Sequence, residues 1–254
     1  MKSRIANAAV VAVLWVQQVE SHYYFNHLIA NGTIFPNWKY VRPVLNGSGL
    51  PSDLMLPYPM YDPTSTGFRC GLNQTGSGAM TEIATLVAGS TVGFRPNFWQ
   101  VGPGVAAWHD GPLQAYLARS PEQTRKGLKN WDGDGEYFKI AKTTPDDPRA
   151  WFYNTYHSNN TVNTWNFTLP LTTPPGLYLL RAESIYPHFL NSTQLYASCA
   201  QVEVVGPGGA KSDPGPNVKF PGAFDTSHPG VWVSEEVRKN WTLYQYPGPE
   251  VWTG

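Results

Sequence analysis

His22 has the most distinctive chemistry in this sequence, because the residues before it resemble a leader that is removed. As a mature N-terminus it would offer its α-amino nitrogen and its imidazole Nδ1, which can chelate one metal ion. The pKa of an α-amino group is about 7.7–8.0, so a metal can displace its proton near neutral pH. One more imidazole would complete a T of three nitrogens, a tetragonal arrangement that selects Cu(II). The alternative is that a histidine at this position is an accident of cleavage.

The leader has the three parts of a secretory signal. It begins with basic residues, continues with an apolar run (Ala6–Val16) and ends with Val19 and Ser21 at the −3 and −1 positions of a cleavage site. The run is shorter than the ~20 residues that a transmembrane helix needs. We therefore expect residues 1–21 to be a signal peptide and the mature protein to be secreted and extracellular. The alternative is an N-terminal anchor that stays attached.

Charge and cysteine content narrow the class of partner. The chain of 254 residues has 18 basic and 18 acidic side chains, so nothing in its charge attracts nucleic acid or an anionic membrane. A neutral polysaccharide fits better, and we expect a monomer. The two cysteines, Cys70 and Cys199, should form a disulfide in an oxidising compartment, the alternative being two buried thiols. Seven Asn-x-Ser/Thr sequons are candidate glycosylation sites: Asn31, Asn46, Asn73, Asn159, Asn166, Asn191 and Asn240.

Short runs with alternating apolar residues, separated by Gly and Pro, predict an all-β domain. The predicted strands are Trp38–Val41, Thr91–Phe94, Leu113–Leu117, Tyr137–Ile140, Thr164–Leu169, Leu177–Ala182 and Gln194–Val205. Such spacing favours an immunoglobulin-like or fibronectin-like β-sandwich with long loops and few short helices. Helices are possible near Pro121–Lys129 and Trp232–Arg238.

The tail Gly206–Gly254 is rich in Pro and Gly, but it carries too many large apolar residues for a disordered linker. We expect it to be an ordered arm that packs along the sandwich. Residues 22–254 then form a single domain with no appended carbohydrate-binding module.

Several short sequence motifs follow one another along the mature chain. They are HYYFNHLIANGTIFPNWKYVR, AGSTVGF, WHDGPLQAYLARSP, DGDGEYFKI, PPGLYLLRAESIYPH, TQLYASCAQVEV, FPGAF and YQYPGPEVWTG. Together they resemble the fungal lytic polysaccharide monooxygenases of auxiliary activity family nine, formerly filed among glycoside hydrolases. The resemblance runs from His22 to Gly254.

The resemblance implies a copper site. His22 would supply the amine and Nδ1 ligands, and His109 of the WHDGP string would supply Nε2. Tyr196 would lie on the copper axis as a distant, mostly protonated phenol. Gln194 would point its amide at the position where an oxygen species binds. His188 would donate a proton or a hydrogen bond to that species.

The resemblance also implies the role of three residues outside the copper site. Tyr244 would be the surface aromatic residue that stacks on a sugar ring. Cys70 and Cys199 match the disulfide that flanks the core.

Each site residue also has a simpler interpretation. His109 precedes a Gly-Pro turn and could be a loop residue, and Tyr196 could pack in the core. Gln194 shares a strand face with Tyr196 because side chains repeat with period two, which is what the site needs.

The sequence departs from the family pattern at two places. The interval from His188 to Gln194 is shorter than is usual in the family. Asp110 stands where the family often has proline.

The reaction that the resemblance implies is oxidative cleavage of a β-1,4-linked glucan, with cellulose as the family default and hemicelluloses as alternatives. One copper ion would cycle between Cu(II) and Cu(I), with an external electron donor and O2 or hydrogen peroxide, and hydrogen would be abstracted at C1 or C4.

Two other functions compete with this reading. A hydrolase could use paired carboxylates from Asp132, Asp134 and Glu136, although a Gly-rich acidic turn explains these more simply. A secreted copper-binding or carbohydrate-binding protein on the same scaffold would lack catalysis. Gln194 and Tyr196, retained beside both copper histidines, argue against the latter.

Overall fold

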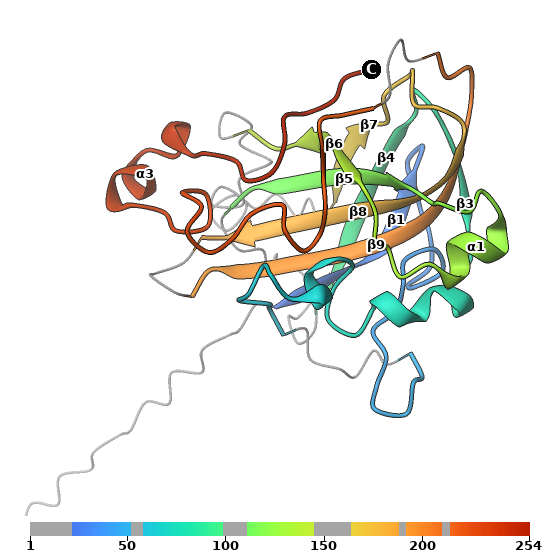
Figure 1. Ribbon diagram of the computed structural model, residues 1–254, viewed down its shortest axis with the longest axis horizontal. Coiled ribbons are helices and arrows are strands. Elements are labelled where there is room, and N and C mark those ends of the chain that lie inside the picture. The colour runs from blue at the N-terminus through green and yellow to red at the C-terminus, as the bar shows by residue number, and fades with distance from the viewer. Residues whose placement is uncertain (1–21, 52–57, 99–110, 145–163, 188–191, 210–213) are drawn as a thin grey trace, which may run out of the picture.

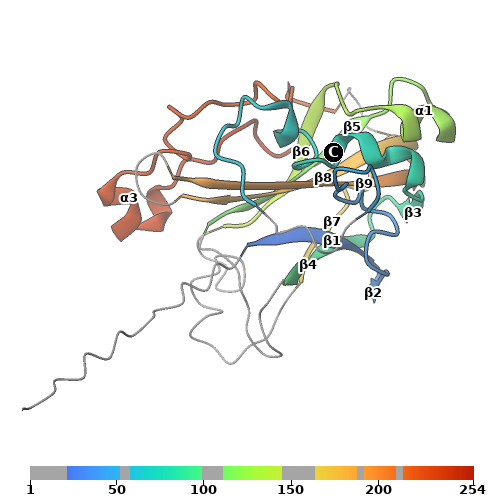
Figure 2. The same cartoon turned by 90° about the horizontal axis from the view of Figure 1, so that it is seen from below.

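Two stacked β-sheets make up the protein, and the few helices are short (Figure 1, Figure 2). The computed structural model describes residues 22–51, 58–98, 111–144, 164–187, 192–209 and 214–254. In the described residues no helix is long and apolar enough to cross a membrane. The sandwich architecture expected from the strand pattern is confirmed.

The smaller sheet has the strand order β2-β1-β4-β7. Its strands are β1 (Tyr23–Ala30), β2 (Thr33–Ile34), β4 (Thr91–Phe98) and β7 (Trp165–Thr168). All neighbours are antiparallel, and the β1–β4 register shifts between Phe25 and His27. Because β1 begins one residue after His22, the candidate metal-binding residue lies at the end of a buried strand.

The larger sheet has the strand order β10-β6-β5-β8-β9-β3. Its strands are β3 (Ala84–Val87), β5 (Leu113–Arg119), β6 (Tyr137–Lys142), β8 (Gly176–Tyr186), β9 (Gln194–Val205) and β10 (Asn217–Val218). β3 pairs with β9 in parallel, whereas the other pairs are antiparallel. Figure 2 shows β1 and β4 in one layer and β8 and β9 in the other.

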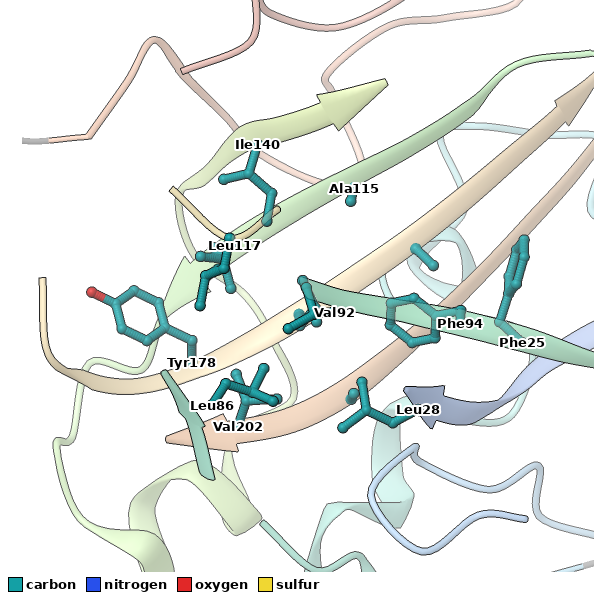
Figure 3. Close-up of a cluster of buried hydrophobic side chains, with 14 of the residues drawn as sticks. Phe25, Leu28, Leu86, Val92, Phe94, Ala115, Leu117, Ile140, Tyr178 and Val202 are labelled. Carbon is teal, nitrogen blue, oxygen red and sulfur yellow. The ribbon is translucent and has the colours of Figure 1, made fainter. Parts of the chain in front are cut away.

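Apolar side chains from both sheets meet between the layers (Figure 3). Phe25 and Phe94 of the smaller sheet pack edge to face with ring centroids 6.1 Å apart. Ala115 and Leu117 of β5 face this core, whereas Tyr116 between them belongs to a second cluster on the outer face. Successive side chains of β5 point to opposite faces of the sheet, and both sets are buried, because the outer face of the sheet is also covered.

The C-terminal arm, residues 214–254, covers that outer face. The Phe220 ring lies 5.1 Å from the Tyr116 ring, centroid to centroid, and accepts the Arg181 guanidinium 3.7 Å above it. Near the end of the arm, the Trp252 amide donates to the Lys139 carbonyl over 2.7 Å. Residues 214–254 are therefore an ordered arm, as the apolar content of the tail predicts.

β9 makes backbone hydrogen bonds and a disulfide with segments from the early part of the chain. Besides its parallel pairing with β3, its Cys199 carbonyl accepts from the Arg42 amide over 2.9 Å. Cys199 is also bonded to Cys70, with 5.0 Å between the Cα atoms. The predicted disulfide is confirmed, and it fixes a loop segment against the strand that carries Gln194 and Tyr196.

In the described residues two short α-helices lie outside the sheets. α1 (Arg125–Asn130) starts at Thr124, whose side chain accepts from the Gly127 amide, and α3 (Glu235–Lys239) starts at Ser234, which accepts from the Val237 amide. Each of these two capping side chains pairs with an amide in the first turn of its helix that has no partner within the helix. The other helical turns that the structure describes are of the 3-10 type: Thr66–Phe68, Thr75–Met80 and Trp241–Leu243.

The predicted strands at residues 91, 113, 137, 164, 177 and 194 all exist, and both helices fall where they are expected. The predicted strand Trp38–Val41 is wrong. Trp38 has a positive φ of 57°, and only Val41 makes an isolated bridge, to Ala200. A left-handed residue ends regular strand pairing, and an apolar count alone does not reveal it.

Candidate metal centre

His22, Gln194 and Tyr196 come together at one end of the sandwich. His22 precedes β1, and the other two residues open β9. The rings of His22 and Tyr196 have centroids 6.4 Å apart and are tilted by 45°. His22 and Gln194 are half-buried, whereas Tyr196 is only 4 % exposed. A polar edge at the surface is thus backed by a buried phenol ring.

Gln194 and Tyr196 share a face and are bonded to each other. The Tyr196 hydroxyl donates to Oε1 of Gln194 over 2.5 Å. The two residues lie opposite Tyr186 and Ser184 of β8, which makes this pair part of regular antiparallel pairing. The period-two interpretation is therefore confirmed, and the hydrogen bond fixes the orientation of the glutamine amide.

Tyr23 holds the Tyr196 ring from the opposite sheet. The two rings stack at a centroid distance of 4.6 Å and an interplanar angle of 13°. The Tyr23 hydroxyl donates to Oγ of Ser184 over 2.6 Å, and both residues are fully buried. Burial raises the pKa of Tyr23, so this phenol stays protonated. Two neighbouring tyrosines, Tyr23 and Tyr24, follow His22, and core packing is expected for at least one of them, but nothing in the sequence pairs Tyr23 with Ser184.

His109 and His188 lie outside the described residues, as does Asp110. Their nearest described neighbours are at the same end of the larger sheet. Gly111 lies against β8, where a Cβ atom on it would collide with the Ile185 carbonyl oxygen, and the Ile185 amide donates to the Pro112 carbonyl over 3.1 Å. Pro187 directly follows β8. The segments that lead to both histidines are therefore fixed next to the start of β9.

A buried group of charged side chains lies on the outer face of the larger sheet. Nη1 of Arg181 donates to Glu183 over 2.5 Å, and both side chains are 0 % exposed. Gln114 donates to the other carboxylate oxygen over 2.8 Å. Nearby, Nζ of Lys139 donates to the Pro247 carbonyl over 2.9 Å, and burial lowers the pKa of Lys139 to about 8. The group joins β5, β6 and β8 to the C-terminal arm.

Tyr244 does not have the expected surface position. Its side chain is 6 % exposed, and its hydroxyl donates to the Gly230 carbonyl over 2.5 Å. Burial raises its pKa, and its ring lies 5.1 Å from that of Tyr246. The prediction that Tyr244 is an exposed stacking residue is wrong, because the preceding turn of the arm covers it.

The acidic string behind the hydrolase interpretation is held by ion pairs. Nη1 of Arg69 contacts Asp132 over 2.7 Å and Nη2 contacts Asp134 over 3.3 Å, while Glu136 lies 3.8 Å from Lys219. Residues 131–136 form a loop with a bend at Gly135, in which the Asp134 amide donates to Oδ1 of Asp132 over 3.0 Å. Throughout the part of the chain that the structure describes, no three His, Cys, Asp or Glu side chains gather as a metal site.

The other histidines and the sequons divide by their surroundings. His27 bonds the Phe35 carbonyl over 2.9 Å, and His228 accepts from the Gly230 amide over 3.0 Å, as suits structural residues. His157 lies outside the described residues. The exposed sequon asparagines are Asn31, Asn73, Asn166 and Asn240, Asn46 is half-buried, and Asn159 and Asn191 lie outside the described residues.

The donor set at this end suits copper better than a hard cation. Imidazole nitrogen is a copper and zinc ligand, whereas calcium and magnesium take carboxylate and carbonyl oxygens. A half-buried His22 with the Tyr196 ring beside it fits nitrogen ligation with a phenol nearby.

Known proteins resemble the chain over almost its whole length. The model of Auxiliary Activity family 9 (formerly GH61) matches residues 22–246. The AA9 family lytic polysaccharide monooxygenase U of Thermothielavioides terrestris is 36 % identical over 250 residues, covering 92 % of this chain and 93 % of that protein. Monooxygenase H of Malbranchea cinnamomea is 38 % identical over 243 residues, with the same coverage of 92 % and 93 %. The crystal structure of HiLPMO9B superimposes with a TM-score of 0.69 at 28 % identity, over 92 % of this chain and 100 % of that one.

Proposed function

The chain belongs to Auxiliary Activity family 9, whose members are lytic polysaccharide monooxygenases, and on this premise we propose that it is a secreted, copper-dependent enzyme that cleaves β-1,4-linked glucan. The observation that carries the proposal is the arrangement of His22, Tyr196 and Gln194 at one end of the sandwich. Cellulose is the proposed substrate, and hemicelluloses are alternatives. The proposed products are oxidised at C1, at C4 or at both.

We propose that His22 and His109 hold the copper. His22 would contribute its α-amino group and Nδ1 once residues 1–21 are removed, and the family match that begins at residue 22 supports this maturation. Gly111, two residues after His109, is fixed against β8 at the same end, which supports the pairing. Bound copper would supply one-electron chemistry with an external donor and O2 or hydrogen peroxide.

The remaining residues would set the surroundings of the metal. Tyr196 would place a buried phenol next to the metal, and its stacking on Tyr23 restricts its movement. Gln194, oriented by the Tyr196 hydroxyl, would present its amide to the oxidant. His188, one residue beyond Pro187, would donate a proton there. Such outer groups tune a metal site by orientation and hydrogen bonding.

The test uses the secreted protein with its N-terminus checked by mass spectrometry. It is loaded with one equivalent of copper and incubated with phosphoric-acid-swollen cellulose, with and without ascorbate. We expect reductant-dependent aldonic acids or 4-ketoaldoses, whose type distinguishes C1 from C4 oxidation. His109→Ala should abolish them, whereas His27→Gln, which changes a histidine bonded to the main chain, should retain them.

Other outcomes would contradict the proposal in different ways. Tight copper binding without oxidised sugars on cellulose or hemicelluloses would identify a copper-binding relative without catalysis. Ordinary sugars released without reductant would point to hydrolysis instead.

A further inference from the structure

The arm that buries Tyr244 exposes another aromatic residue in its place. The Tyr244 hydroxyl bonds to Gly230, and two residues later Trp232 is 43 % exposed. Val231 and Val233 on either side are 1 % and 8 % exposed and belong to two different apolar clusters. Trp232 is thus the exposed residue between two buried valines, and its side chain belongs to neither cluster.

Trp232 is linked to the candidate metal centre through short contacts. The Val231 carbonyl accepts from the Thr193 hydroxyl over 2.5 Å, and Thr193 directly precedes Gln194. Val231 packs in the same cluster as Leu195 of β9. In both views α3, which follows Trp232 closely, lies beyond the end of the sandwich at which β1 begins (Figure 1, Figure 2). The exposed indole and His22 therefore belong to the same end of the molecule.

The turn that carries Trp232 is well fixed. The Val231 and Trp232 amides both donate to the His228 carbonyl, over 2.8 Å and 2.9 Å. A Cβ on Gly230 would collide with the Gln245 carbonyl, so this glycine allows close contact with the segment that contains Tyr244. A rigid support matters because a ring that is held in place loses little freedom when it binds.

We propose that Trp232, and not Tyr244, is the aromatic residue that stacks on a sugar ring of the polysaccharide. The inference rests on the proposed function and names a substrate-contacting residue for it. The ligand is a pyranose unit of a neutral β-1,4-linked chain, whose C–H groups lie against the indole face. An exposed large aromatic residue on a hydrogen-bonded turn suits such a contact, because it offers apolar area at a wet surface.

The test is equilibrium binding of the metal-free protein to phosphoric-acid-swollen cellulose. Trp232→Ala should weaken binding by about 2- to 12-fold, the range found for stacked aromatic pairs, and Trp232→Phe should keep most of it. The matched control is Leu171→Ala, which removes an apolar side chain that is 60 % exposed at the opposite end of the sandwich. High salt should leave the difference unchanged, because a neutral sugar contact is not screened.

Activity separates this role from a structural one. If Trp232 only positions cellulose, Trp232→Ala should lose oxidised product at low cellulose loading and regain it at high loading, with unchanged copper affinity. Unchanged cellulose binding by Trp232→Ala would overturn the inference. So would a defect confined to reactions driven by a protein electron donor, which would make Trp232 a docking residue for that donor.

Failure of the proposed function has a different signature. A wild-type protein that binds cellulose through Trp232 but yields no oxidised sugar would refute the monooxygenase assignment and leave the stacking role intact. A wild-type protein that oxidises cellulose, together with a Trp232→Ala variant that binds normally, would refute the stacking role alone.

Discussion

At the scale of single residues, the stacked pair of Tyr23 and Tyr196 depends on a hydrogen bond between the sheets. Ser184→Ala removes the acceptor of the buried Tyr23 hydroxyl and should destabilise the protein by about 1–3 kcal/mol. Adding Tyr23→Phe removes the buried hydroxyl that donated to Ser184 and should recover part of this loss. Urea unfolding of the two single variants and the double variant gives the coupling energy. Strictly additive losses would mean that the bond contributes nothing beyond its separate parts.

Lys139 gives the stability of the fold a specific dependence on pH. Burial lowers its folded-state pKa to about 8, whereas a lysine in an unfolded chain titrates near 10.5. Between these values the unfolded chain binds more protons, so this residue makes the protein more stable as pH rises through the window. Below about pH 8 both states are charged, and the cost of burying the ammonium is fully present.

Lys139→Met tests this dependence. The free energy of unfolding of the variant minus that of the wild type should fall by about 2 kcal/mol between pH 7 and pH 9.5, since the wild type alone gains. Subtracting the two curves cancels the buried tyrosines, which titrate in both proteins. A difference that stays constant over this range would show that Lys139 is not the group responsible.

Sequence reasoning at this scale succeeds where partners are close in the chain. Gln194 and Tyr196 are two residues apart, so the period of a strand places them together. Tyr23 and Ser184 are separated by 161 positions, and no local pattern pairs them. Tyr244 illustrates the opposite error: a motif gives its identity, but its exposure depends on a turn 14 residues earlier.

At the scale of elements, β8 carries an ion pair that the covering arm removes from water. Glu183→Leu would leave the Arg181 guanidinium buried without its carboxylate, at a cost of about 3–5 kcal/mol. The double variant Arg181→Met/Glu183→Leu should recover most of this, because apolar side chains can replace a buried pair. Denaturant titrations measure both changes.

The control for this prediction is the ion pair of Arg125 and Glu203, whose side chains are 58 % and 38 % exposed. Glu203→Gln should cost less than about 1 kcal/mol because water screens the pair. Equal losses in the buried and the exposed pair would contradict the effect of burial.

Element prediction depends on how clean the alternation is. β8 and β9 are long strands, and the sequence pattern predicts both of them. β1 and β3 were not predicted, although both form. In β1 every third residue is less buried, and the strand has an irregularity between Phe25 and His27, so a period of two does not fit it. β3 is a four-residue edge strand that gains its place from parallel pairing with β9, which no local sequence pattern reveals.

At the scale of the whole molecule, the disulfide joins segments 129 residues apart. Cys70→Ala/Cys199→Ala should lower the free energy of unfolding by roughly 4–5 kcal/mol, through the greater freedom of the unfolded chain. For a domain of this size the melting temperature should fall by roughly 8–20 °C. Calorimetry of the metal-free protein measures it. A loss below about 1 kcal/mol would show that the denatured chain keeps these segments together without the bond.

The convergence of early segments on β9 has a consequence for biosynthesis. Arg42, Cys70 and β3 all find their partners in a strand that ends at Val205, so they cannot be completed while the chain is still short. At about 5–20 residues per second, β9 leaves the ribosome roughly 6–24 s after β3. During this interval the apolar face of β3 and the Cys70 thiol await partners that have not yet been made. Production of this protein should therefore depend on chaperones that bind the exposed apolar face of the incomplete sheet and on thiol isomerases that act on Cys70.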